Sequence, residues 1–209
     1  MNNILTIIRH GESQWNFEKR FTGLSDIGLT AKGVEEAKQA GQILLDQNIN
    51  YDMAFCSKLK RAKNTLDLVL ETMQHKDIEI VAHKALNERD FGDITGKYHR
   101  DIINQYGQTQ VDIWRNSYES APPNGESLED LADRCLPYFN SEILTQYQLG
   151  KNILIVAHSV TIRALLMQIK QISKIDIVHL SVKNGQPLNF ILNKDHQFIQ
   201  HSNRVATEI

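Results

Sequence analysis

The stretch ILTIIRHGE, residues 4–12, decides how this chain is expected to fold. Its first five residues are mostly apolar and predict a short buried β-strand. A cation and an imidazole, Arg9 and His10, follow at the point where that strand should end. In open α/β sheets, ligands bind beyond the carboxyl ends of the strands. An arginine beside a histidine at such a position favours an anionic ligand, above all a phosphate.

A second copy of this arrangement lies in the C-terminal half of the chain. The apolar run at residues 153–157 predicts another strand, and His158 follows it directly, with Arg163 five residues further along. An Arg-His-Gly tripeptide alone is a weak signal, because average composition gives it in about one chain in a hundred of this length. Two histidines at the ends of two strands are harder to ascribe to chance. The sequence therefore predicts one site built from both halves of the chain.

Length and charge restrict the class of protein. The 209 residues can bury a good core as one domain, or as one domain with an insertion. The formal net charge is -2 and the isoelectric point is near 6.4, which argues against a nucleic-acid partner. The longest apolar runs are far shorter than the roughly 20 residues that cross a bilayer, and we expect residues 1–3 to lead into the first strand rather than to begin a signal peptide. We expect a cytoplasmic protein with no membrane partner.

Apolar runs that predict strands alternate with amphipathic segments that predict helices. Strands are expected at residues 4–8, 51–57, 78–81, 153–157 and 188–192, and helices at residues 34–44, 59–69, 127–139 and 161–172. This alternation predicts an α/β fold, a three-layer sandwich in which a mostly parallel central sheet carries helices on both faces. Loops are expected at residues 13–29 and 85–96. We expect residues 1–209 to form a single catalytic domain with a loop or helical insertion around residues 97–126.

The predicted strand ends supply side chains suited to phosphoryl transfer. A neutral imidazole at His10 can attack phosphorus and form a phosphohistidine, which divides one difficult displacement into two easier ones. Arg9, Arg61 and a protonated His158 would neutralise charge on the equatorial oxygens, where most of the catalysis of this reaction resides. These four residues are therefore candidate catalytic residues.

Glu88 is the candidate proton donor and acceptor for the leaving and attacking oxygens, because it follows a predicted strand beside the same cluster. Glu126 and Asp90 are alternatives for this role. The glycine-containing loop after the first strand lacks a nucleotide-binding fingerprint, so neither ATP nor NAD is expected. Nothing in the sequence implies a metal site.

These motifs resemble those of the histidine phosphatase superfamily, and most closely its cofactor-dependent phosphoglycerate mutases in their short form. The resemblance extends over nearly the whole chain, through RHGESQWN (9–16), RFTG (20–23), SKLKRA (57–62), LNER (86–89), PPNGESL (122–128) and AH (157–158). It implies a phosphoglycerate mutase-like α/β fold with His10 phosphorylated, Glu88 as acid and base, and His158, Arg9 and Arg61 around the phosphate. The expected substrate contacts are Ser13, Asn16, Thr22, Gly23, Arg89, Phe91, His99, Arg100, Arg115, Asn116, Ser159 and Val160.

The chain departs from the mutase pattern at several of these positions. Glu88-Arg89-Asp90-Phe91 stands for Glu-Arg-His-Tyr, His99 for a lysine, Arg115-Asn116 for paired arginines and His158-Ser159-Val160 for His-Gly-Asn. Most of these positions resemble those that hold the far end of the substrate. A hydrogen bond to a charged group contributes roughly 1.5 to 3 kcal/mol, so the loss of two or three weakens transition-state binding about a thousandfold. Arg100, Arg115 or a protonated His99 are the expected compensation.

The resemblance implies that 2,3-bisphosphoglycerate, with no metal, primes His10 for the interconversion of 3- and 2-phosphoglycerate in glycolysis and gluconeogenesis. One alternative is a phosphomonoesterase with the same phosphohistidine and water as acceptor, because Phe91-Gly92 resembles a pair found in the phosphatase branch. A second alternative is a phospho-ligand-binding protein in which Ser159 and Val160 have impaired turnover. The expected partner is a small phosphorylated metabolite, and a homodimer is one option.

Overall fold

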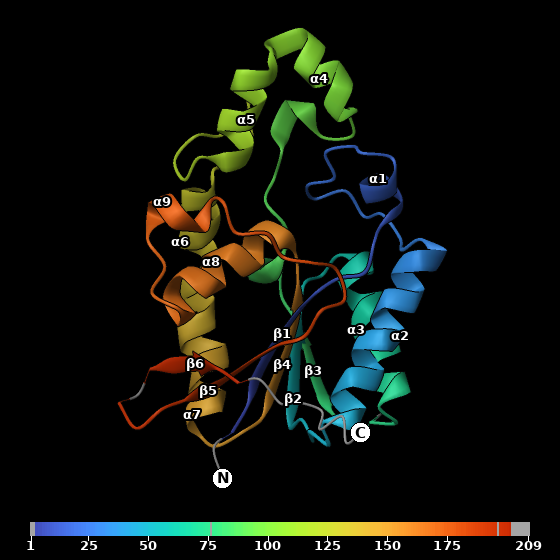
Figure 1. The fold of residues 1–209 in the computed structure, drawn as a ribbon, viewed down its shortest axis with the longest axis vertical. Helices are drawn as coiled ribbons and strands as arrows, with labels where there is room; N and C mark the ends of the chain where they lie inside the picture. Colours follow the sequence, from blue (N-terminus) through green and yellow to red (C-terminus); the bar gives the residue numbers. More distant parts are fainter. Residues whose placement is uncertain (1–2, 76, 196, 202–209) are drawn as a thin grey trace, which may run out of the picture.

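A six-stranded sheet in the order β3-β2-β4-β1-β5-β6 runs through the molecule (Figure 1). The computed structural model describes residues 3–75, 77–195 and 197–201, and the strands and helices given below are those of these residues. The strands are β1 (Leu5–Arg9), β2 (Met53–Cys56), β3 (Glu79–Ala82), β4 (Ile153–Ala157), β5 (Leu188–Leu192) and β6 (Phe198–Gln200). The first four pair in parallel, whereas β5 and β6 continue the sheet antiparallel. The predicted α/β fold is confirmed, with a mixed sheet whose antiparallel pairings lie at one edge.

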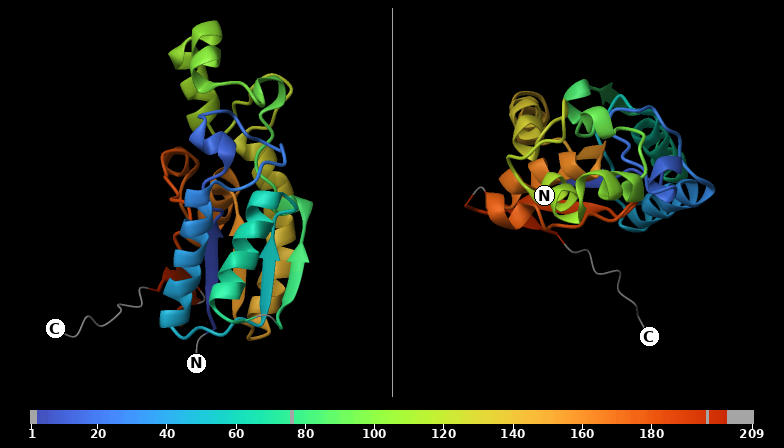
Figure 2. Two further views of the ribbon diagram at one scale, coloured as in Figure 1. Left: turned by 90° about the vertical axis from the view of Figure 1, so that its right-hand side faces the viewer. Right: turned by 90° about the horizontal axis from the view of Figure 1, so that it is seen from above.

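Helices cover both faces of the sheet (Figure 2). On one face α2 (Ala31–Asp46) and α3 (Lys60–Thr72) pack against Ile8 and its neighbours, and on the other α6 (Leu128–Tyr138) and α8 (Ser159–Ile169) pack against Ile7. Successive side chains of a strand point to opposite faces, which is why the apolar run of β1 is buried on both sides. The result is the three-layer arrangement expected from the sequence.

The shorter elements lie at the ends of this sandwich. They are α1 (Gln14–Phe17), α4 (His99–Tyr106), α5 (Gln108–Asn116), a π-helix (Phe139–Leu144), α7 (Thr145–Gln148), α9 (Lys174–Ile177) and two 3-10 helices (Lys84–Leu86 and Gly92–Ile94). Helices α4 and α5 stand beyond the carboxyl ends of the parallel strands, at the top of Figure 1. The expected insertion at 97–126 therefore contains two helices, and the predicted loop at 13–29 contains α1. In the described ranges no helix is both long and apolar enough to span a bilayer.

Local sequence signals explain where the main helices begin. The Thr30 hydroxyl accepts a hydrogen bond from the Gly33 backbone N–H at 3.0 Å, and Ser127 and Asp130 cap each other at the start of α6. Such N-caps stabilise a helix by about 1 kcal/mol. Helix α6 contains Pro137, whose ring nitrogen donates no hydrogen bond, and it passes into the π-helix at Phe139.

Two glycines let the loop after β1 lie directly against helix α2. A Cβ added at Gly11 would lie 2.1 Å from the carbonyl oxygen of Gly33, and one added at Gly33 would lie 2.1 Å from the carbonyl oxygen of Glu12. The backbones are also joined by a hydrogen bond of 2.9 Å from the Thr30 N–H to the Glu12 carbonyl. The backbone after His10 is therefore fixed against the first turn of α2.

Candidate active site

The sheet register brings the two strand-end histidines together. Strand β1 pairs with β4 so that Arg9 lies opposite Ala157, and the His10 backbone N–H donates to the Ala157 carbonyl at 3.0 Å. His10 and His158 follow these paired residues, and the centroids of their rings are 4.9 Å apart. Both side chains are buried. The predicted pairing of residues from the two halves of the chain is thus realised at the carboxyl edge of the sheet.

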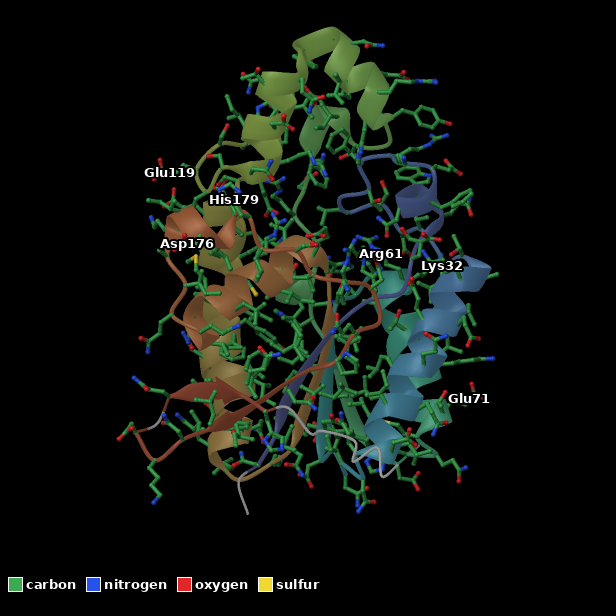
Figure 3. The ribbon with its side chains drawn as sticks, in the orientation of Figure 1. Lys32, Arg61, Glu71, Glu119, Asp176 and His179 are labelled. Carbon is green, nitrogen blue, oxygen red and sulfur yellow. The ribbon has the colours of Figure 1, made fainter. Side chains whose placement is uncertain are left out.

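Arg61 lies against both rings. Its Nε is 3.3 Å from Nε2 of His10 and 3.2 Å from Nδ1 of His158. Its two terminal nitrogens donate to the carbonyls of Ser25 and Gly23, each at 2.8 Å. Figure 3 shows Arg61 at the start of α3, near the upper ends of the strands. Glu71 lies towards the other end of that helix. The guanidinium therefore fixes the rings and the Gly23–Ser25 loop in one unit.

The hydrogen bonds of His10 determine its tautomer. Nδ1 lies 2.6 Å from the Gly11 carbonyl oxygen, which can only accept, so Nδ1 carries the proton and Nε2 keeps its lone pair. Burial, together with the positive charges of Arg61 and Arg9, holds the pKa of His10 well below its ordinary value of 6.5. The ring is therefore neutral at pH 7, with Nε2 available as a nucleophile.

His158 has the opposite tautomer. Its Nδ1 accepts from Arg61, so the proton is on Nε2, which is buried and has no partner among the described residues. Burial and the charge of Arg61 also lower the pKa of His158 well below 6.5. This lowered pKa is opposite in direction to the expectation of a protonated His158. A neutral ring still offers its Nε2–H as a hydrogen-bond donor.

Glu88 reaches the same cavity from the loop after β3. Its Oε1 accepts from the backbone N–H groups of Arg89 at 2.9 Å and Val160 at 3.2 Å, which ties it to the first turn of α8. The alternative carboxylate Glu126 does not line the cavity, since it is bound to Arg134 and to the Asp90 N–H. Asp90 likewise lies outside the lining. The geometry favours Glu88 as the acid and base.

A cavity of about 450 Å³ opens above these side chains. Arg9, His10, Arg61 and Glu88 line it, as do ten of the expected substrate contacts, namely Asn16, Thr22, Gly23, Arg89, Phe91, His99, Arg115, Asn116, Ser159 and Val160. Two expected contacts lie outside it. Ser13 is buried as the N-cap of α1, and the side chain of Arg100 is 80% exposed and paired with Asp101 at 3.0 Å. The expected compensation by Arg100 is therefore wrong.

Several lining residues were not predicted from the sequence. They are Glu12, Lys19, Arg20, Phe21, Arg163, Ser181 and Asn184. The sequence placed Arg163 five residues after His158, and that spacing was the signal for it, but it was not counted among the substrate contacts. Ser181 and Asn184 come from the segment that leads into β5, and the Asn184 amide donates to the His10 carbonyl at 2.6 Å. No local pattern marks such a return of the chain to the site.

Arg89, Arg115 and Arg163 line the part of the cavity that we call the outer part. Burial lowers the pKa of Arg89 to about 10 against the attraction of Glu88, and repulsion by Arg163 and Arg115 acts in the same direction as burial. Arg163 is held by a 2.7 Å hydrogen bond from its Nε to the Leu180 carbonyl. Such mutual repulsion between cations is relieved when an anion binds among them.

His99 contributes no charge to this outer part at neutral pH. Burial lowers the pKa of His99 to about 4, and the charges of Arg115 and Lys19 add to this effect. Its ring packs against Phe21, with centroids 4.3 Å apart. The expected compensation by a protonated His99 is therefore wrong above about pH 4.

Some buried polar atoms in and beside the cavity have no partner in the part of the chain that the structure describes. They include Arg9 Nε, Thr22 Oγ1, Arg89 Nε and His158 Nε2. Buried N–H and O–H groups are nearly always satisfied in folded proteins, so these four groups remain available to donate hydrogen bonds. His158 itself is not among the residues that line the cavity. Within residues 3–75, 77–195 and 197–201, no group of three or more His, Cys, Asp or Glu side chains could hold a metal ion.

Comparison with known proteins gives consistent results at the level of the family. The family described as histidine phosphatase superfamily (branch 1) matches residues 5–204. The 2,3-bisphosphoglycerate-dependent phosphoglycerate mutase of Parvibaculum lavamentivorans is 44% identical over 193 residues, 92% of each chain. The protein of the same name from Rhizobium rhizogenes is 43% identical over 195 residues, 93% of this chain and 92% of that one.

Solved structures of lower sequence identity share the fold. The alpha-ribazole phosphatase of Shigella flexneri is 28% identical with a TM-score of 0.80, covering 95% of this chain and 94% of that one. The protein YhfR of Bacillus stearothermophilus is 26% identical with a TM-score of 0.83, covering 96% of both chains. On the strength of the site geometry and of these matches, the chain belongs to the histidine phosphatase superfamily.

Proposed function

We propose that this protein is a 2,3-bisphosphoglycerate-dependent phosphoglycerate mutase that interconverts 3-phosphoglycerate and 2-phosphoglycerate. The observation that carries the proposal is the neutral His10 ring, whose Nε2 lone pair lies beside Arg61 and His158. Relatives more than 40% identical over about nine tenths of the chain carry that activity in their names, which supports the same substrate here. By the same likeness we infer a cytoplasmic role in glycolysis and gluconeogenesis, with a small phosphorylated metabolite as partner.

His10 is the nucleophile of the first transfer. 2,3-Bisphosphoglycerate, when bound, would supply the phosphoryl group that primes the enzyme. The Nε2–phosphorus bond forms as the ester bond breaks, and Glu88 gives a proton to the leaving oxygen. Arg9, Arg61 and the Nε2–H of His158 stabilise the negative charge on the equatorial oxygens.

The second transfer reverses these roles. A hydroxyl of phosphoglycerate attacks the phosphorus on His10, the Nε2–phosphorus bond breaks, and Glu88 takes up the hydroxyl proton. This gives 2,3-bisphosphoglycerate. The same residues then transfer its other phosphoryl group to His10, which leaves the isomeric phosphoglycerate and a phosphorylated enzyme. The unpartnered donors on Arg9 and Thr22 fit the oxygens of the transferred group.

The outer arginines would hold the far end of the substrate. Arg89, Arg115 and Arg163 line the outer part of the cavity, and the unpartnered Nε of Arg89 suits a carboxylate or a second phosphate. Asn16, Gly23, Phe91, His99, Asn116, Ser159 and Val160 are the remaining proposed substrate contacts. We regard residues 1–209 as a single catalytic domain, with 97–126 as the insertion that covers the site.

A phosphomonoesterase is the second candidate, with the same phosphohistidine and water as acceptor. Two observations favour it: the uncharged His99 and Asn116 leave the outer cavity with fewer cations, and the alpha-ribazole phosphatase of Shigella flexneri has the same fold. A protein that only binds a phosphorylated ligand has less support, because binding alone does not need a neutral histidine with an unprotonated Nε2 in the cavity. A homodimer stays a prediction.

Phosphorus NMR of 3-phosphoglycerate, with a catalytic amount of 2,3-bisphosphoglycerate, tests the proposal. A mutase gives the 2-phosphoglycerate resonance until equilibrium is reached, with little inorganic phosphate. Inorganic phosphate as the main product would refute the mutase and establish the phosphatase. Intact mass after incubation with 2,3-bisphosphoglycerate should show one phosphate adduct, and binding without an adduct would favour the ligand-binding protein.

A further inference from the structure

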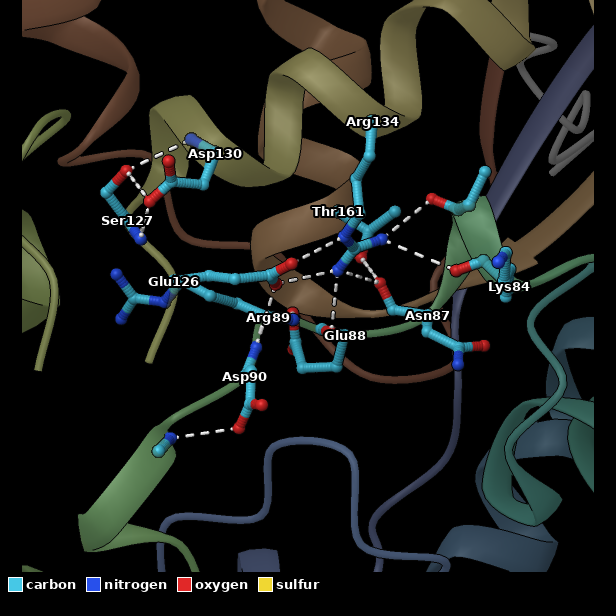
Figure 4. Close-up of polar contacts among 12 residues, drawn as sticks. Lys84, Asn87, Glu88, Arg89, Asp90, Glu126, Ser127, Asp130, Arg134 and Thr161 are labelled. Carbon is cyan, nitrogen blue, oxygen red and sulfur yellow. Dashed lines mark hydrogen bonds and ion pairs between the residues drawn. The ribbon is translucent and has the colours of Figure 1, made fainter. Parts of the chain in front are cut away.

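Arg134 of α6 holds the backbone that carries Glu88, although it does not line the cavity (Figure 4). Its Nη1 donates to the Ala85 carbonyl at 3.0 Å, and its Nη2 donates to the carbonyls of Asn87 at 3.2 Å and Glu88 at 2.9 Å. A longer contact of 3.4 Å reaches the Lys84 carbonyl. One guanidinium thus binds four carbonyl groups of a single loop.

Glu126 binds the same loop further along the chain, at Asp90. Its two oxygens accept from Nε of Arg134 at 2.8 Å and from Nη2 at 2.9 Å, which makes the pair bidentate. Oε2 of Glu126 also accepts from the Asp90 backbone N–H at 3.0 Å. The pair therefore binds carbonyls up to Glu88 and an N–H just after it, as the dashed lines of Figure 4 show.

The charges of the pair stabilise each other. Burial alone would raise the pKa of Glu126, but the hydrogen bonds from Arg134 and from the Asp90 N–H outweigh burial and lower it. Both side chains are about three quarters buried. Bidentate arginine–carboxylate pairs hold their geometry more firmly than single contacts do.

Arg134 holds the backbone carbonyl of Glu88, and helix α8 holds its carboxylate. Its Oε1 accepts from the Val160 N–H of α8, and the Thr161 hydroxyl donates to the Asn87 carbonyl at 2.8 Å. With its carboxylate on α8 and its carbonyl on α6, Glu88 has little freedom to move. Release of the carbonyl end would let the carboxylate shift, and a displacement of about 1 Å in a reacting group reduces a rate by as much as about a hundredfold.

We propose that Arg134 and Glu126 are positioning residues that aim the Glu88 carboxylate at the bridging oxygen of the phosphoester. The inference rests on the proposed function, in which Glu88 protonates the leaving oxygen. The proton that Glu88 gives is needed when an alkoxide leaves, and it is not needed when a nitrophenolate leaves. A defect in aiming should therefore depend on the leaving group.

The experiment compares the single-turnover rate of His10 phosphorylation from 2,3-bisphosphoglycerate and from 4-nitrophenyl phosphate in Arg134→Lys and Glu126→Gln. We expect phosphorylation from the bisphosphoglycerate to slow about tenfold to a hundredfold, while that from the nitrophenyl ester stays within about twofold. Equal slowing with both donors, or none with either, would overturn the inference. Glu129→Gln is the matched control on α6, since Glu129 forms an exposed ion pair with Lys174, and it should leave both rates unchanged.

Arg134→Lys is then combined with Glu88→Gln. If Arg134 acts through Glu88, Arg134→Lys adds no further slowing to the Glu88→Gln variant with 2,3-bisphosphoglycerate as donor. Full additivity would refute the positioning role while leaving the acid role of Glu88 intact. Normal phosphorylation by Glu88→Gln alone would refute the acid role itself, so the two failures are distinguishable.

Discussion

The rings of His10 and His158 lie edge to face at 60°, with their centroids 4.9 Å apart. One presents a lone pair to Arg61 from Nε2, and the other presents a lone pair from Nδ1. A single cation therefore stabilises two neutral imidazoles with opposite tautomers. This arrangement supports the proposed roles of His10 in the attack on phosphorus and of His158 as a hydrogen-bond donor.

Substitution of His10 should abolish the covalent step. We expect His10→Ala to form no phosphate adduct with 2,3-bisphosphoglycerate and to lose at least about 10⁴-fold in turnover, because the nucleophile and its tautomer are both removed. Intact mass and phosphorus NMR measure the two effects. His179→Ala is the control, since His179 is exposed and lies away from Arg61 in Figure 3. An adduct in His10→Ala would assign the nucleophile elsewhere.

The depressed histidine pKa values predict that stability falls in mild acid. Burial and the nearby arginines keep the pKa of His10 and His158 below 6.5, so under that pH the unfolded chain binds more protons than the folded one. The contribution of the two rings to the free energy of unfolding is therefore fully present above about pH 6.5. It decreases as the pH falls, by up to about 1.4 kcal/mol per pH unit for each ring. His99, with a pKa of about 4, acts in the same direction.

Urea unfolding between about pH 7 and pH 5 measures this loss, because most carboxylates stay ionised over that range. His10→Gln should make the unfolding free energy depend less steeply on pH, and His179→Gln, at an exposed position, is the variant for comparison. An unfolding free energy that stays constant over this range would contradict the depressed pKa values.

Arg163 should contribute to substrate binding rather than to phosphorylation of His10. It lines the cavity and its Nε donates to the Leu180 carbonyl, so Arg163→Gln removes a cation that has no hydrogen bond to His10, Arg61 or Glu88 among the described residues. We expect KM for 3-phosphoglycerate to rise roughly tenfold to a hundredfold, since a hydrogen bond to a charged group is worth about 1.5 to 3 kcal/mol. Arg100→Gln is the matched control, because that side chain is exposed and outside the cavity. Equal effects of the two substitutions would exclude this role.

Added positive charge in the outer cavity should favour the mutase reaction. Asn116 and the uncharged His99 both line it, and we expect Asn116→Arg together with His99→Lys to raise the rate of 2-phosphoglycerate formation. Each new hydrogen bond to the substrate carboxylate adds about tenfold or more. Phosphorus NMR follows both products in one experiment. An unchanged rate would show that neither position limits the reaction.

The sequence predicted the fold well because its signals are local. Apolar runs located the strands of the parallel part of the sheet, and Thr30 and Ser127 marked the helix starts through their own backbone partners. Strand β6 was not predicted, since it has three residues that are mostly exposed and carries little apolar alternation. Its place in the sheet depends on pairing with β5, which no local pattern encodes.

For the candidate site, the sequence could indicate residue types at strand ends but not their surroundings. The uncharged state of His158 follows from complete burial beside Arg61, and that of His99 from burial near Arg115, and neither environment can be read from neighbouring residues. Arg100 and His99 are adjacent on α4, and a rotation of about 100° per residue sends one side chain out and the other in. Only the packing of α4 decides which of them faces the cavity.

The contact between Gly11 and Gly33 has a consequence for anyone who wishes to transplant this catalytic loop. Two main chains touch there with no space for even a methyl group. The segment bearing His10 and the start of α2 would therefore have to be transferred together. A host scaffold must offer glycine at both places, and a library that randomises either position will return almost only the parental residue.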